Sequence, residues 1–135
     1  DADAYGSGNY MNLSSTLLSA VATGGFWMQG NQIAYCWHSV AGYSKIGSYS
    51  GSGVSGKEVT LDFNPSFVLI KRTNGTAGWV IVDDKRGTKE LYPHVANQED
   101  TSTTNIVLGP NKFTLNSTGS WYNASGGTYL YMAFK

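Results

Sequence analysis

Alternating apolar and polar positions recur along the chain from about residue 33, and they predict short β-strands. Val59, Leu61 and Phe63 alternate with polar residues, as in a strand with one face on a core. Two runs, 67–70 and 79–82, are apolar at every position, which predicts strands covered on both faces. Asn74-Gly75 between them is a strong hairpin signal, so residues 66–84 are predicted to form a central hairpin.

Further segments carry the strand pattern, and turn residues separate them at short intervals. We predict strands over 33–40, 43–48, 106–108, 113–115 and 128–134. Many short strands of this spacing predict an all-β fold, namely an antiparallel β-sandwich of the jelly-roll or lectin-like kind. Its core is expected to contain Tyr35, Trp37, Val59, Leu61, Val68, Ile70, Val80, Val82, Tyr129 and Met132.

The N-terminal part of the chain has a weaker pattern. Between Asn12 and Ala22, leucines at helical spacing fit one short helical turn, and a loop fits equally well. The apolar run 33–37 can also be laid over 130–134, as in a weak internal repeat. We therefore predict two parts: residues 1–32, an N-terminal segment that could close a preceding unit, and residues 33–135, the β-sandwich domain.

Charge and composition exclude several classes of protein. Nine Lys and Arg balance nine Asp and Glu, which provides no electrostatic footprint for nucleic acid or an anionic membrane. The apolar run 129–134 is far shorter than the ~20 residues of a membrane span, so no membrane insertion is expected. Cys36 is the only cysteine and is expected to be a buried small hydrophobe.

The sequence provides no convincing catalytic or metal-binding pattern. No Gly-x-Ser-x-Gly turn accompanies His38 or His94, and neighbours such as Asp83 and Asp84 point to opposite faces of a strand. One cysteine and two distant histidines lack zinc-ligand spacing. We therefore predict neither an enzyme, nor a metal site, nor a cofactor. Binding of Ca²⁺ by Asp83, Asp84 or Asp100 stays open at this point.

Aromatic residues in polar surroundings are the most informative candidates for a binding site. Trp121-Tyr122 stands between stretches of Asn, Ser, Thr and Gly, and Tyr92-Pro93-His94 has a similar setting. Flat rings flanked by amides and hydroxyls suit sugars, because a pyranose face stacks on a ring while its hydroxyls form hydrogen bonds. The predicted ligand-binding residues are Trp121, Tyr122, Tyr92, His94 and Asn116. Alternatively, these rings plug the ends of the sandwich or pack in a subunit interface.

Four blocks in fixed order carry a resemblance to a known family. They are residues 34–51, 65–72, 78–83 and 123–134, which contain Trp37-His38-Ser39-Val40-Ala41-Gly42-Tyr43 and Asn123-Ala124-Ser125-Gly126-Gly127-Thr128-Tyr129. Over residues 31–135 the chain resembles the C-terminal β-sandwich module of tail-fibre and tail-tip proteins of tailed bacteriophages. The segments 51–57 and 85–104 are shorter than in many of those relatives.

The resemblance implies a virion protein of the tail fibre or tail tip, with a role in host-cell attachment. Its implied partners are a host surface polysaccharide or outer-membrane protein and other tail proteins, and its implied assembly is a homotrimer. Three functions stay open: a receptor-binding module, a purely structural fibre domain, and an enzyme that degrades the cell envelope. The carboxylate geometry argues against the enzyme, and many copies on one virion would let weak sites sum to high avidity.

Overall fold

The computed structural model describes residues 11–13, 18–20, 35–87, 89–101 and 104–135, and the chain divides into two compact units, Asp1–Cys36 and Trp37–Lys135. In the first unit, β1 (Met11–Leu13) and β2 (Leu18–Ala20) form an antiparallel pair. A helical turn over these positions is therefore wrong, because so short a segment gains more backbone hydrogen bonds by pairing than by nucleating a helix. The rest of segment 12–22 lies outside the described residues.

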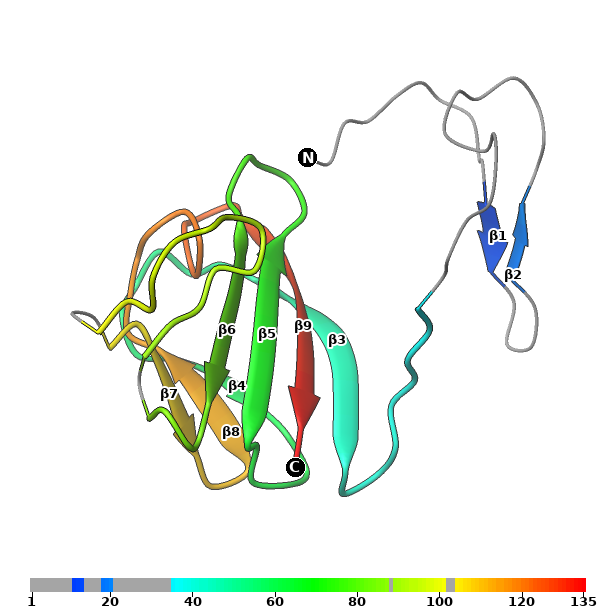
Figure 1. Cartoon of the computed structure of the whole chain (residues 1–135), viewed down its shortest axis with the longest axis horizontal. Helices are drawn as coiled ribbons and strands as arrows, with labels where there is room; N and C mark the ends of the chain where they lie inside the picture. The colour runs from blue at the N-terminus through cyan, green and yellow to red at the C-terminus, as the bar shows by residue number, and fades with distance from the viewer. Residues whose placement is uncertain (1–10, 14–17, 21–34, 88, 102–103) are drawn as a thin grey trace. The chain divides into compact units, whose positions relative to one another are not determined.

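The second unit is a β-sandwich of two antiparallel sheets packed face to face, which confirms the predicted fold class (Figure 1). The four-stranded sheet has the order β3-β9-β5-β6, and the three-stranded sheet has the order β4-β8-β7. The central hairpin is confirmed as well, with Val68 opposite Val82 and Ile70 opposite Val80. The strands are β3 (Ser44–Ser50), β4 (Lys57–Thr60), β5 (Phe67–Arg72), β6 (Trp79–Asp83), β7 (Ile106–Gly109), β8 (Lys112–Leu115) and β9 (Thr128–Phe134).

The core lies between the two sheets and is rich in aromatic rings. Phe113 of β8 packs edge-on against Tyr131 of β9 at 5.4 Å and against Tyr49 of β3 at 6.2 Å between ring centroids, which joins the sheets. Met132 is only half-buried, so its prediction as a core residue is wrong. β9 is apolar at almost every position, and such a strand does not reveal from its pattern which face points inward. Seven of the predicted core residues are buried: Val59, Leu61, Val68, Ile70, Val80, Val82 and Tyr129.

The strand predicted over 33–40 is wrong for its described residues. Residues 35–39 belong to no strand, and Tyr35 and Trp37 are 74% and 53% exposed. Cys36 is exposed too, which corrects its prediction as a buried residue. Ser39 lies at the edge of β3, where the Ile46 N–H donates to Ser39 Oγ at 3.0 Å. A side-chain hydroxyl thus takes a position that a paired strand would otherwise fill. Ile33 and Ala34 lie outside the described residues.

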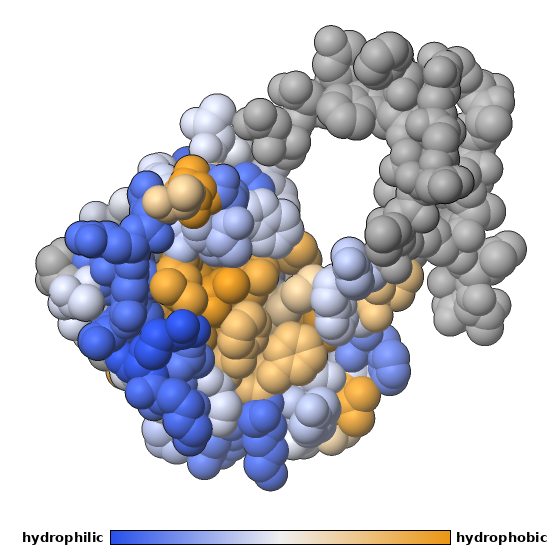
Figure 2. Space-filling view, in the orientation of Figure 1, coloured by the Kyte–Doolittle hydropathy of each residue, from blue (hydrophilic) through white to orange (hydrophobic). Residues whose placement is uncertain are grey.

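An apolar row crosses the side of the four-stranded sheet that faces away from the core, here called the outer face. Cross-strand neighbours form the row: Ile46 with Met132, Met132 with Leu69, Leu69 with Ile81, and Ile81 with Leu91. Each of these side chains is half-buried. Figure 2 shows the resulting apolar patch over the sheet. Full coverage of both faces, as predicted for β5 and β6, is therefore not provided by the described residues.

A buried asparagine ties the β3–β4 connection to the loop before β9. Asn123 is fully buried, and its Oδ1 accepts a hydrogen bond from the Ser52 N–H at 2.7 Å. Its amide Nδ2 donates to the Val54 carbonyl at 2.7 Å. Gly51 passes so close to the Ala124 carbonyl that a Cβ would overlap it, so this crossing requires glycine. The loop that carries Trp121 is thereby anchored to the body of the sandwich.

Candidate functional site

Two loops bring three of the predicted site residues together. The Tyr92 loop (residues 84–105) connects β6 to β7, and the Trp121 loop (residues 116–127) connects β8 to β9 (Figure 1). The Tyr92 and Trp121 rings meet edge to face, with centroids 5.3 Å apart and planes at 83°. The His94 ring lies 5.5 Å from Trp121. We call Tyr92, His94 and Trp121 the aromatic cluster.

His94 is held in place by the backbone at the start of β6. The Trp79 N–H donates to His94 Nδ1 at 3.2 Å. In a neutral imidazole the hydrogen then sits on Nε2, which leaves an N–H donor on an exposed ring. Gly78 makes this position possible, because a Cβ there would overlap the imidazole. The cluster therefore combines aromatic surface with a fixed hydrogen-bond donor.

Tyr122 supports the aromatic cluster from within the core. It is 8% exposed, and its hydroxyl donates to Glu90 Oε2 at 2.5 Å. The same carboxylate oxygen lies 3.1 Å from the Tyr92 hydroxyl. Tyr122 was predicted to contact ligand, but the structure gives it the role of fixing Glu90 and, through Glu90, Tyr92.

Both tyrosine hydroxyls of this network have a raised pKa. Burial, with Glu90 and Asp100 adding to it, raises the pKa of Tyr92 to about 12. Burial and then the hydrogen bond to Glu90 raise the pKa of Tyr122 well above its ordinary value. Both groups are therefore neutral donors at physiological pH.

A polar hollow of about 650 Å³ opens beside the aromatic cluster. Tyr92 forms part of its wall, and the other lining residues are Ala96, Asn97, Gln98, Glu99, Asp100 and Thr101. The hollow exists because Asp100 pairs with Glu90 through two backbone hydrogen bonds of 3.0 Å, which folds the loop back on itself. Lys89 Nζ lies 3.5 Å from Glu99 Oε1. Amide, hydroxyl and carboxylate groups thus surround a space of the size of a small ligand.

Sequence reasoning missed Glu90 and named Asp100 as a possible Ca²⁺ ligand. Glu90 is fully buried, however, and Glu99 and Asp100 are half-buried. One signal was available: Glu90 and Tyr92 stand two positions apart around Leu91, as in a strand whose polar side chains share a face.

Asn116 lies apart from the aromatic cluster. It follows β8, and its Nδ2 is 3.5 Å from the Thr104 carbonyl. Its own carbonyl accepts a hydrogen bond from Ser55 Oγ at 2.8 Å. The described contacts of Asn116 are therefore with residues that line neither the cluster nor the hollow.

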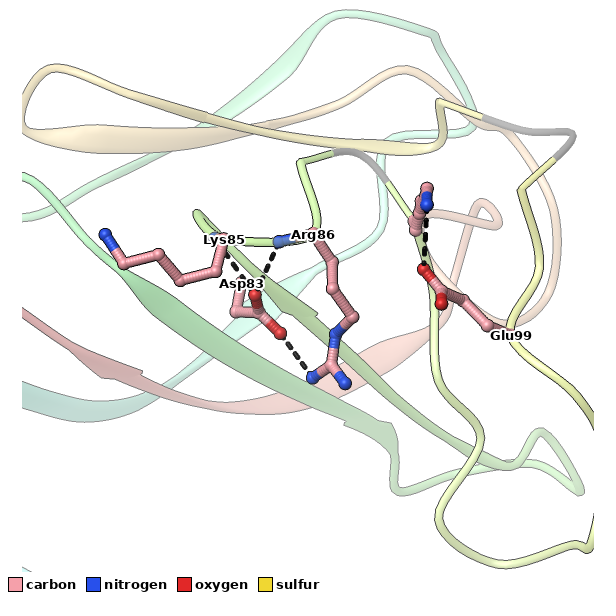
Figure 3. Close-up of polar contacts among 5 residues, drawn as sticks. Asp83, Lys85, Arg86 and Glu99 are labelled. Atoms are coloured by element: carbon pink, nitrogen blue, oxygen red, sulfur yellow. Dashed lines mark hydrogen bonds and ion pairs between the residues drawn. The ribbon is translucent and has the colours of Figure 1, made fainter.

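The acidic pair Asp83-Asp84, at the end of β6, is engaged in local interactions. Asp83 Oδ1 accepts hydrogen bonds from the backbone N–H groups of Lys85 and Arg86, and its other oxygen pairs with the Arg86 guanidinium (Figure 3). These bonds, chiefly that from the Arg86 N–H, lower the pKa of Asp83. Asp84 pairs with Lys85 at 3.0 Å. Over the ranges that the structure describes, no group of three or more His, Cys, Asp or Glu is arranged to hold a metal ion.

No helix among the described residues is long and apolar enough to span a membrane.

Comparisons with known proteins identify a family but provide no characterised relative. Neither a curated protein nor a solved structure matches the chain significantly. One family model matches residues 2–135, which is nearly the whole chain. The chain therefore belongs to the DUF7483 family, a domain of unknown function.

Proposed function

We propose that this protein is a glycan-binding module of a bacteriophage tail fibre or tail tip that attaches the virion to its host. The observation that carries the proposal is the aromatic cluster beside a polar hollow. Tyr92 belongs to both, since it packs on Trp121 and lines the hollow. An aromatic surface next to amide, hydroxyl and carboxylate groups matches the alternation of apolar faces and hydroxyls on a sugar.

The site is well suited to recognition by many weak contacts. Trp121 and Tyr92 are half-buried, so each ring is fixed by packing while part of it remains accessible. Because the two side chains are already fixed before a ligand arrives, little conformational entropy is lost on binding. The resemblance to tail-fibre modules supplies the context, because a virion that presents several copies gains avidity from shallow sites.

The proposal is tested by adsorption of the full chain, displayed multivalently, to host bacteria and their purified surface polysaccharides. We expect saturable binding that one polysaccharide inhibits. Trp121→Ala and Tyr92→Ala should each weaken it by about tenfold or more, which corresponds to ~1.4 kcal/mol. Trp37→Ala and Tyr43→Ala serve as matched controls, because these exposed rings belong to neither loop of the site. Equal adsorption by all four folded variants would contradict the proposal.

A purely structural role in a fibre is the second candidate, and the outer face favours it. The apolar row from Ile46 to Leu91 crosses the whole four-stranded sheet and stays half-exposed. In contrast, the away-facing side of the three-stranded sheet carries Glu58 opposite Thr114. A second copy of the chain is the occupant proposed here. A chain with equal numbers of acidic and basic residues has no net charge to repel its copies. Such assembly would be compatible with glycan binding at the loops.

A further inference from the structure

Negative charge predominates around the hollow. Glu99 and Asp100 line it, and none of its lining residues is basic. Lys89 forms an ion pair with Glu99 at 3.5 Å and so compensates the charge of one of these two carboxylates. The wall of the hollow therefore presents more carboxylate than cation to a ligand.

A third carboxylate lies buried behind this wall. Glu90 has no exposed surface, and its Oε1 accepts no hydrogen bond from the described residues. Its Oε2 shares the Tyr92 hydroxyl with Asp100 Oδ2, at 3.1 and 3.2 Å. Glu90 and Asp100 are also directly opposite on paired backbone segments, which places their side chains on one face about 5 Å apart. Two acidic groups thus converge on the single hydroxyl that forms the hollow's aromatic wall.

We propose that the hollow binds a sugar bearing a positively charged amino group, an inference that rests on the proposed glycan-binding function. The ammonium would lie at Asp100 and Glu99, and the apolar sugar face on the Tyr92 ring, with Trp121 beside it. Aromatic faces attract cations, so rings and carboxylates act in the same direction. A carboxylated or phosphorylated sugar would be repelled by the same groups. A metal ion fits less well, because no group of three carboxylate or histidine ligands is found among the described residues.

The test compares three tetrasaccharides in calorimetric titrations of the full chain: β-1,4-linked glucosamine, its N-acetylated form, and galacturonic acid. We expect the glucosamine tetramer to bind about tenfold more tightly than the N-acetylated tetramer, and the galacturonic acid tetramer most weakly. The preference should shrink when salt shortens the range of the charge interaction. Equal affinity for charged and N-acetylated tetramers, or binding that EDTA abolishes and Ca²⁺ restores, would overturn the inference.

A substitution at Asp100 tests the assignment to this site. Asp100→Asn keeps the size of the side chain and is expected to reduce the tenfold preference for the glucosamine tetramer to about twofold. Asp84→Asn is the control, because Asp84 is exposed and pairs only locally with Lys85. If Asp100→Asn kept the full preference for the glucosamine tetramer, the assignment of the amino group to Asp100 would be overturned. If no tetramer binds while Trp121-dependent adsorption to host cells persists, the inference fails and the proposed function stands. If that adsorption is absent too, both fail.

Discussion

Gly78 is the residue that gives His94 its place in the aromatic cluster. Gly78→Ala should push the imidazole aside, because the new methyl group would overlap the ring. The Trp79 N–H would then lose its acceptor and the cluster its donor. We expect glycan affinity to fall about fivefold, the value of one hydrogen bond of ~1 kcal/mol. The fold should be retained, because an exposed side chain can move.

The measurement is adsorption of the variant together with its thermal unfolding. Gly109→Ala is the matched control, since a Cβ at Gly109 meets only ordinary contacts. Full affinity in a folded Gly78→Ala variant would show that His94 does not contribute to binding.

The buried tyrosines predict how stability depends on pH. Burial raises the pKa of Tyr92, Tyr122 and Tyr49 above the ordinary value of about 10. Between pH ~10 and these raised values the unfolded chain has released protons that the folded chain still holds. The stability that these tyrosines contribute is therefore complete below pH ~10. Above pH ~10 the free energy of unfolding should fall, by up to about 1.4 kcal/mol per pH unit for each such tyrosine.

Urea unfolding from pH 8 to pH 11 measures this loss of stability. Tyr122→Phe should flatten the alkaline fall, whereas Tyr43→Phe should leave it unchanged, since Tyr43 is 57% exposed. A free energy of unfolding that stays constant up to pH 11 would be inconsistent with tyrosines buried as described.

At the residue scale, the sequence pointed to the rings of the aromatic cluster but not to the buried carboxylate beside them. Tyr92, His94 and Trp121 were recognisable because large aromatics stood among small polar residues. Glu90 was not recognisable, because a buried carboxylate looks like a surface one until its partner from another loop is known. That partner, Tyr122, stands 32 residues away in the chain.

At the element scale, Asn123 joins the β3–β4 connection to the Trp121 loop. Asn123→Ala would leave the Ser52 N–H and the Val54 carbonyl without their bonds. We expect a loss of about 1–3 kcal/mol in the free energy of unfolding, at about 0.5–1.5 kcal/mol for each of the two lost hydrogen bonds. Asn116→Ala, at an exposed position with one long side-chain bond, should change it by no more than ~0.5 kcal/mol.

Denaturant unfolding of the two variants provides the comparison. Equal stabilities would mean that Asn123 does not anchor the loop. Adsorption should also decline in Asn123→Ala, because the Trp121 loop loses its attachment to the sandwich.

Elements whose signals are local were predictable, and elements whose partners are distant were not. The hairpin β5–β6 follows from two uninterrupted apolar runs with Asn-Gly between them, and β9 from its apolar run. Segment 35–40 has equally strong strand composition but makes only one bridge, Val40 with Ser44, because its backbone finds no strand partner among the described residues. Pairing of β3 with β9 joins residues more than 75 positions apart, and no local pattern specifies it.

At the scale of the whole molecule, the outer face predicts self-association. Light scattering of the full chain should show a concentration-dependent oligomer, with a trimer expected from the resemblance to fibre modules. Leu69→Lys places a charge in the apolar row and should shift the chain to monomer. Thr114→Lys, on the polar away-facing side of the other sheet, should not. A monomer at every concentration would rule out the outer face as a contact between copies.

Binding of a glycan at Trp121 is tested by one NMR titration. The chain has four tryptophans, so its ¹H–¹⁵N spectrum contains four indole signals as reporters. Trp121→Phe identifies the signal of Trp121 by its absence. On adding an oligosaccharide cut from the host polysaccharide, we predict that this signal shifts most and saturates. A shift confined to the other three indoles, or no shift at all, would rule out glycan binding at Trp121.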